Sequence, residues 1–306
     1  MSRNGQWYPP EWPDRIRAHA RGELTPVTPR RAATVMLLRD TPPPEPPTGD
    51  AGPAATATGP AVYLLRRRTS MAFAGGAYAY PGGGVDPRDE GEVAWAGPST
   101  EEWADRLGVP AVEAQAVVCA AVRETFEEAG VLLAGPDAAS VVADTTGSDW
   151  EDDRRALVAR EVSFADFLAR RKLVLRSDLL SAWARWITPE FEDRRYDTWF
   201  FVAALPAGQR TRDVSTESDR TVWATPADAA AGYDRGEFLM MPPTIATLRE
   251  LTELTELTAG RAAADVLAAA GSRDLTPIVA SARMEGDEIV LSWPGHHEFE
   301  KRISTV

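Results

Sequence analysis

The chain has 306 residues and a formal net charge of −13, with 44% hydrophobic and 26% charged residues. This length predicts one or two folded domains. The negative charge argues against partners such as nucleic-acid polymers and anionic membranes, because no overall positive field attracts phosphate groups. The only cysteine, Cys119, excludes an intramolecular disulfide, and no apolar run is long enough to span a bilayer. We therefore expect a cytoplasmic protein without a membrane partner.

The first part of the chain alternates between irregular and strand-like segments. Residues 1–30 contain prolines and aromatic residues without a clear period and predict an irregular N-terminal lead-in. The apolar runs at 31–40 and 60–69 predict two strands. Between them, residues 41–60 are rich in Pro, Ala, Thr and Gly, which cannot bury enough apolar surface to pack. We expect a flexible loop there.

A run of three glycines follows an aromatic stretch in "AYAYPGGGVD", and three glycines let the backbone approach a ligand or an ion closely. Residues 86–112 then read as an insertion that contains a short helix at 100–107. A longer helix is predicted to begin at Pro110 and to end at Gly130, a typical left-handed C-terminal cap.

The last two turns of this helix carry an unusual concentration of charge. At about 100° per residue, Glu124, Glu127 and Glu128 share one face opposite the apolar face, and Arg123 lies beside Glu127. Carboxylates at this helix end oppose the helix dipole, and the like-charged pair four residues apart costs about 0.2–0.5 kcal/mol. A divalent cation would reverse both penalties, and Mg²⁺ prefers such oxygen ligands. A solvated acidic face is the alternative interpretation.

The segment "RETFEEAGV" from Arg123 to Val131 resembles the second half of the box of the Nudix hydrolases, G-x5-E-x7-R-E-U-x-E-E-x-G-U, where U is aliphatic. Gly83 would then be the box glycine, so that the insertion splits the box. Counting forward from Gly83 places Asp89 at the first box glutamate, whereas counting back from Arg123 places Gln115 there. A split box resembles the branch typified by the peroxisomal coenzyme A diphosphatase of mammals and its bacterial relatives.

The resemblance implies a fold, an activity and a set of site residues. The fold would be α/β (α+β), with a mixed β-sheet sandwiched between helices over residues 31–258. The activity would be metal-dependent hydrolysis of a diphosphate linkage in a small nucleotide-derived substrate. Coenzyme A or acyl-CoA would be the first candidate substrate. Mg²⁺ or Mn²⁺ would be held by Glu127 and Glu128, with Glu124 as a further ligand or as the base. The Gly83 carbonyl is a candidate extra ligand, and Arg123 would orient Glu127.

Two other functions fit the same resemblance. One is a diphosphatase acting on ADP-ribose, NADH or oxidised nucleotides. The other is a Nudix-fold binding module without catalysis, a reading that the missing first glutamate favours and the intact glutamate face opposes.

Further site residues are predicted around this core. Glu217 in "STESDRTVW" is a candidate for an additional catalytic carboxylate, with a solvated loop charge as the alternative. Arg66, Arg67 and Arg68 end a predicted strand, and Arg194 and Arg195 precede another. From these two clusters we predict Arg66, Arg68 and Arg195 as the residues that bind phosphate; solvated strand ends are the alternative. Tyr80, like Tyr78, is a candidate for stacking on adenine, although the alternation of the two tyrosines along a strand favours core packing.

The rest of the chain has clear elements without an assigned chemistry. We predict a helical insertion over 149–187, a strand in "YDTWFFVAAL", a strand and a helix around Thr225, and a helix with leucines at every third position in "TLRELTELTELT". Residues 259–306 read as a C-terminal extension with a β-hairpin that turns at Gly286. The oligomeric state is open, a homodimer included.

Overall fold

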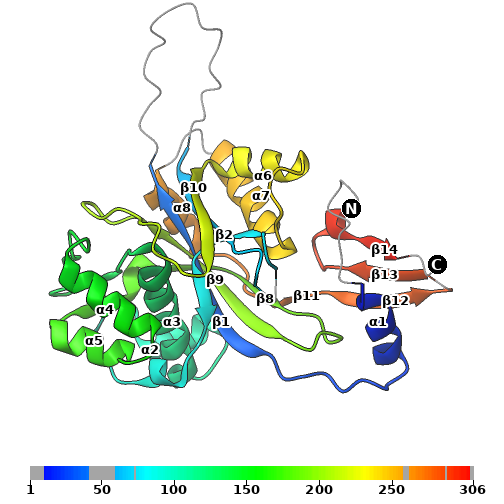
Figure 1. Ribbon diagram of the computed structural model, residues 1–306, viewed down its shortest axis with the longest axis horizontal. Helices are drawn as coiled ribbons and strands as arrows, with labels where there is room; N and C mark the ends of the chain where they lie inside the picture. Colours follow the sequence, from blue (N-terminus) through cyan, green and yellow to red (C-terminus); the bar gives the residue numbers. More distant parts are fainter. Residues whose placement is uncertain (1–9, 41–58, 72–73, 258–261, 287, 304–306) are drawn as a thin grey trace, which may run out of the picture.

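A computed structural model describes residues 10–40, 59–71, 74–257, 262–286 and 288–303 of the chain (Figure 1). Most of the predicted flexible loop, residues 41–58, lies outside these ranges. The description below concerns the described residues.

A mixed sheet forms the centre of the molecule (Figure 1). Its strands are β1 (Arg30–Arg39), β2 (Ala61–Arg67), β3 (Tyr78–Ala79), β4 (Gly82–Gly84), β8 (Ser181–Ile187), β9 (Tyr196–Ala204), β10 (Ser218–Ala224) and β11 (Ile278–Val279). Six of them follow the order β10-β2-β1-β9-β8-β11, and the short strands β3 and β4 pair with β2 and β1. The pairs β1–β9 and β8–β11 are parallel, and the other pairs are antiparallel.

Helices cover both faces of this sheet (Figure 1). On one face lie α2 (Thr100–Leu107), α3 (Ala111–Ala129), α4 (Ser148–Val158) and α5 (Phe164–Arg171), and on the other α6 (Pro226–Asp234), α7 (Pro242–Leu257) and α8 (Ala263–Ala270). Side chains alternate along β1, so that Val35 and Leu37 join the core under α3 while Met36 and Leu38 join the core under α7. The predicted sandwich of a mixed sheet between helices is therefore confirmed.

Two small sheets lie beside the central one. The first contains β5 (Trp95–Ala96), β6 (Ala134–Gly135) and β7 (Val174–Arg176), and the second contains β12 (Ser281–Glu285), β13 (Glu288–Ser292) and β14 (Lys301–Ile303). Short 3-10 turns occur at Pro87–Glu90, Ser177–Leu179 and His297–Phe299. The predicted C-terminal hairpin is confirmed as β12 and β13, and β14 extends it to three strands.

The N-terminal lead-in is not wholly irregular, because it contains α1 (Trp12–Ala20) beside β12. Pro13 lies in the first turn of this helix, where the missing N–H would have had no helical partner anyway. Trp12 and Ile16, one turn apart, are its buried residues. The prediction missed this helix because two buried positions make too short a periodic pattern.

The prediction of a helical insertion over 149–187 is confirmed only in its first half. Helices α4 and α5 occupy residues 148–171, but β7 and β8 follow, so the helical prediction was wrong there. Strand β8 is held between β9 and β11, and this long-range pairing overrides the local pattern.

Helix α3 forms as predicted. It starts after Pro110 and is capped by Gly130, whose φ of 71° is left-handed. Val118, Val122 and Phe126 are fully buried on its apolar face, and Cys119 is buried beside them as a packing residue. The C-terminal end of α3 therefore has a fixed position from which its polar side chains project.

Candidate functional site

The C-terminal end of α3 receives positive charge from a different helix. Arg154 of α4 donates a hydrogen bond from Nη1 to the main-chain oxygen of Glu127, over 2.7 Å. A cation near the C-terminus of a helix offsets the helix dipole. Arg154 thus offsets the negative end of the α3 dipole, because the last turn of α3 itself contains no basic residue.

Arg123 joins the two halves of the split box. Its Nε and Nη2 donate to the two carboxylate oxygens of Asp89 over 2.9 and 2.8 Å, a bidentate pair, and Nη2 also donates to the Gly84 carbonyl over 3.0 Å. Asp89 is only 2% exposed. Asp89, the residue counted forward from Gly83, is therefore the one that pairs with the box arginine. Gln115, the residue counted back, donates instead to the main-chain oxygen of Gly91.

The same arginine also contacts the glutamates. Arg123 Nη1 lies 2.7 Å from an oxygen of Glu124 and 3.3 Å from an oxygen of Glu127. The predicted contact with Glu127 is thus present, and the contact with Glu124 is shorter. Burial raises the pKa of Glu124 to about 7; the charge of Arg123 opposes this shift and that of Glu127 adds to it.

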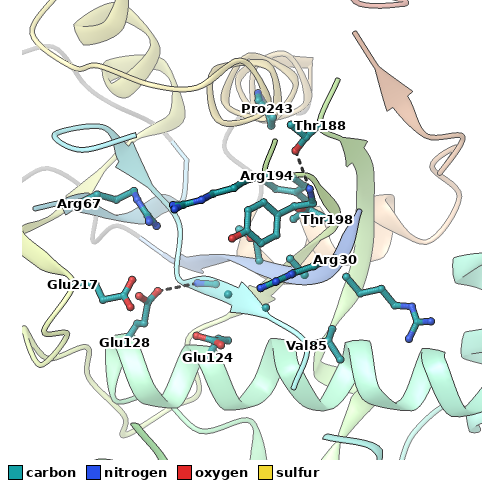
Figure 2. Close-up of a pocket in the computed structure, with 18 of the residues that line it drawn as sticks. Arg30, Arg67, Val85, Glu124, Glu128, Thr188, Arg194, Thr198, Glu217 and Pro243 are labelled. Carbon is teal, nitrogen blue, oxygen red and sulfur yellow. Dashed lines mark hydrogen bonds between the residues drawn. The ribbon is translucent and has the colours of Figure 1, made fainter. Parts of the chain in front are cut away.

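The glycine strand β4 brings main chain against the carboxylates. Strand β4 pairs with β1, and the main-chain N–H of Gly82 donates to Glu128 Oε2 over 2.9 Å (Figure 2). A Cβ atom built at Gly83 would lie 2.4 Å from Glu124 Oε1, closer than atoms can approach. A side chain at position 83 would therefore displace the Glu124 carboxylate from its place between α3 and β4.

Three carboxylates come together above α3. Figure 2 shows Glu217, from the segment before β10, beside Glu128, with Glu124 farther along the same helix. Burial raises the pKa of Glu128 well above its usual range, the charges of Glu124 and Glu217 raise it further, and the Gly82 N–H opposes the shift. The sequence-based prediction that Glu217 joins the glutamates of α3 agrees with this placement.

The chemistry of these donors fits a divalent cation. Negative carboxylates that are buried and repel one another are stabilised by a local positive charge. Within the described ranges, no group of three or more His, Cys, Asp or Glu side chains could hold a metal ion by itself. An open site is what Mg²⁺ needs, because it is usually held by one or two carboxylates, waters and substrate phosphates. Glu124, Glu127, Glu128 and the Gly83 carbonyl are the residues available to hold it.

A cleft of about 1040 Å³ opens over the carboxylates. Arg30 of β1, Arg67 of β2 and Arg194 of the β8–β9 loop line it, and none of the three forms an ion pair with another described residue. Figure 2 shows Arg67 and Arg194 extending toward each other above Glu128 and Glu217, with Arg30 farther along. The Nε atom of Arg67 is buried without a hydrogen-bond partner in this part of the structure.

The four residues predicted to bind substrate do not line this cleft. Arg66 pairs with Asp219 at 2.7 Å, and Arg68 donates to the Ser218 carbonyl. Arg195 donates to the main-chain oxygens of Thr188 and Val27, and the Tyr80 hydroxyl is buried against Thr247 and the Thr244 carbonyl. Side chains alternate between the faces of a strand, so Arg67 faces the cleft while its neighbours do not.

No helix of the described residues is long and apolar enough to cross a membrane.

Comparisons with known proteins agree with this architecture. The model of the NUDT19 Nudix domain matches residues 100–251. The chain is 26% identical to the acyl-coenzyme A diphosphatase NUDT19 of Xenopus laevis over 62% of its length and 59% of that protein. It is 27% identical to the human protein of the same name over 72% of its length and 68% of that protein.

A solved structure shows the same arrangement. The crystal structure of a Nudix hydrolase from Alicyclobacillus acidocaldarius is similar with a TM-score of 0.59 and 25% identity, over 75% of this chain and 96% of that one. The chain spans less than two thirds of the Xenopus relative and of the Gallus gallus relative, 59% and 65% of their lengths.

Proposed function

Because this chain belongs to the Nudix hydrolases, in the branch represented by the NUDT19 Nudix domain, we propose that it cleaves the diphosphate linkage of coenzyme A or acyl-CoA with Mg²⁺ or Mn²⁺. The observation that carries the proposal is that the glutamates of α3 line one cleft together with arginines, among them Arg67 and Arg194, that form no ion pair with a described residue. Carboxylates for a cation and arginines for phosphate are the two kinds of group that diphosphate hydrolysis requires. The cytoplasm remains the proposed location.

The cation, when bound, supplies neutralisation of the diphosphate oxygens and Lewis-acid activation of water. Glu127 and Glu128 would hold it, and Glu124 would serve as a further ligand or as the base. Arg123 is a positioning residue, because Asp89 fixes its guanidinium and it in turn fixes the carboxylate of Glu124. Such second contacts keep a ligand in one orientation.

Glu217 is the exposed member of the carboxylate group. It lies on a segment outside α3, so its position relative to Glu128 depends on the approach of β10 to β2. We assign it as an additional carboxylate for the cation or for the attacking water. Its removal should weaken hydrolysis less than the removal of Glu128, which Gly82 holds in place.

The arginines support a substrate with several phosphate groups. Arg67 and Arg194 lie above the carboxylates, where the diphosphate must lie during hydrolysis, and Arg30 lies farther along the cleft. Coenzyme A carries a third phosphate on its ribose, which ADP-ribose and NADH lack. Cleft arginines beyond the two that lie over the carboxylates therefore favour coenzyme A over these substrates.

The proposal is tested by steady-state kinetics on a panel of diphosphates. The purified chain would be given coenzyme A, acetyl-CoA, dephospho-CoA, ADP-ribose and NADH, each with Mg²⁺, with Mn²⁺ and with EDTA. We expect metal-dependent hydrolysis with the highest kcat/KM for the coenzyme A compounds. A preference for ADP-ribose or NADH would replace the proposed substrate and keep the reaction. If no compound is hydrolysed while Mg²⁺ still stabilises the protein, a binding module is the better account.

A further inference from the structure

The end of the cleft away from the glutamates is built by segments from both ends of the chain. Three tryptophans line it: Trp12 of α1, Trp186 of β8 and Trp293, which follows β13. Their neighbours at this end include Met241, Pro242 and Pro243 at the start of α7. The central sheet and α3 line one part of the cleft, and α1 and the C-terminal sheet add an aromatic wall to the other part.

Packing holds this wall in place. Trp12 contacts Phe191 edge to face, with ring centroids 5.3 Å apart, and its indole N–H donates to Glu192 over 2.6 Å. Trp186 packs on His296 with ring centroids 5.0 Å apart, and Trp293 packs on Phe299 at 6.2 Å. The three tryptophans are 4–7% exposed and belong to one hydrophobic core. A wall that is fixed before a ligand arrives loses little entropy on binding.

One polar atom at this end has no partner. The indole N–H of Trp186 is buried and makes no hydrogen bond to any described residue. A buried donor without a partner costs roughly 1–3 kcal/mol, so such atoms are rare and call for an explanation. Because the nitrogen itself is inaccessible, a ligand carbonyl oxygen would satisfy this donor only if the side chains that cover it shifted.

We propose that the wall of Trp12, Trp186 and Trp293 binds the part of the substrate that extends beyond the diphosphate, an elongated apolar chain that contains amide groups. This proposal rests on the proposed function, which places the diphosphate at the glutamates. In acyl-CoA this part is the acyl-pantetheine arm. Its methyl and methylene groups suit indole and proline surfaces, and an amide carbonyl would reach the Trp186 N–H after a shift of the side chains that cover it.

The wall would also explain a preference between substrates. A nucleotide sugar offers hydroxyl groups that need polar partners, whereas an acyl-pantetheine arm buries apolar surface against the tryptophans. The N-terminal helix and the C-terminal sheet would then act as specificity elements, and loss of their contacts would reduce the advantage of acyl-CoA over a nucleotide sugar.

The experiment uses octanoyl-pantetheine, which lacks every phosphate and therefore reports on this end of the cleft alone. The full chain would be labelled with 5-fluorotryptophan, and the resonances of its 10 tryptophans would be assigned by Trp→Phe substitutions. We expect octanoyl-pantetheine to shift the ¹⁹F resonances of Trp12, Trp186 and Trp293. The resonance of Trp95, which does not line the cleft, should stay in place.

A variant gives the second measurement. Trp293→Ala should weaken octanoyl-pantetheine binding about tenfold, the effect of about 1.4 kcal/mol of lost contact. Trp95→Ala is the control and should leave binding unchanged. If the three resonances do not move in the wild type, the proposal is overturned even if Trp293→Ala does not fold. Hydrolysis of coenzyme A by the same wild-type sample would show that the proposed function survives that result, whereas its absence would overturn the function separately.

Discussion

Glu124→Gln should make the metal-free protein more stable and the enzyme inactive. Burial raises the pKa of Glu124 from 4.5 to about 7 in the folded chain. Each pKa unit corresponds to about 1.4 kcal/mol, so the ionised carboxylate costs about 3 kcal/mol of folding free energy at pH 8. Glutamine has the shape of the protonated acid and avoids this cost.

The pH dependence has a defined sign. A carboxyl group whose pKa is raised by folding favours the folded state below its unfolded pKa of about 4.5, and this contribution is lost as the pH rises through about 7. The wild type in EDTA should therefore lose stability between pH 5 and pH 8 relative to Glu124→Gln. Added Mg²⁺ should restore more stability to the wild type at pH 8 than at pH 5.5, because protons compete with the cation.

The assay is chemical denaturation of both proteins at pH 5 and pH 8, with EDTA and with Mg²⁺, beside hydrolysis of coenzyme A. We expect a difference in unfolding free energy of about 3 kcal/mol at pH 8 in EDTA. Glu101→Gln, on an exposed part of α2, is the control and should behave as the wild type. A Glu124→Gln protein that is less stable at pH 8, or that keeps Mg²⁺-dependent activity, would refute the reasoning.

Three further substitutions test separate parts of the site. Asp89→Asn should lower the unfolding free energy by about 3 kcal/mol, because it weakens a buried ion pair with Arg123; urea unfolding measures this, and an unchanged midpoint would contradict it. Gly83→Ala should lower kcat at least about 100-fold, because its Cβ would displace the Glu124 carboxylate. Circular dichroism should show that the variant keeps its fold, and a kcat equal to that of the wild type would disprove the close approach of Gly83 to Glu124. Arg194→Ala should raise KM for coenzyme A about tenfold with little change in kcat, whereas the control Arg66→Ala should leave KM unchanged. Equal effects of the two variants on KM would argue against phosphate binding at Arg194.

The sequence was informative wherever a local pattern has a local cause. The periodicity of α3 and its cap at Gly130 predicted the position of the glutamates, since both depend on residues within a few turns. The forward count from Gly83 to Asp89 also agrees with the structure, because the short segment between them folds back to Arg123. These features needed no knowledge of the rest of the fold.

The predicted substrate residues show where local reasoning ends. The sequence placed arginines near the site but could not decide which face of each strand turns to the cleft, and a shift of one residue reverses the face. Arg67 lines the cleft where Arg66 and Arg68 were expected, and Arg194 where Arg195 was expected. That choice is made by the pairing of β2 with β1 and of β8 with β9.

The aromatic wall could not be predicted for a different reason. Trp12 and Trp293 lie near opposite ends of the sequence, and they line the same cleft only because α1 packs beside β12. Contacts between residues so far apart leave no local pattern. The same limit applies to β8, whose strand conformation depends on its neighbours β9 and β11.

The most direct test of the account is mass spectrometry of the products formed from coenzyme A and Mg²⁺. The wild type and the control Glu101→Gln should yield 3′,5′-ADP and 4′-phosphopantetheine, and Glu128→Gln should yield neither above the uncatalysed background. Equal yields from the wild type and Glu128→Gln would contradict the central role of the α3 glutamates. Intact coenzyme A with all three proteins would contradict the proposed substrate.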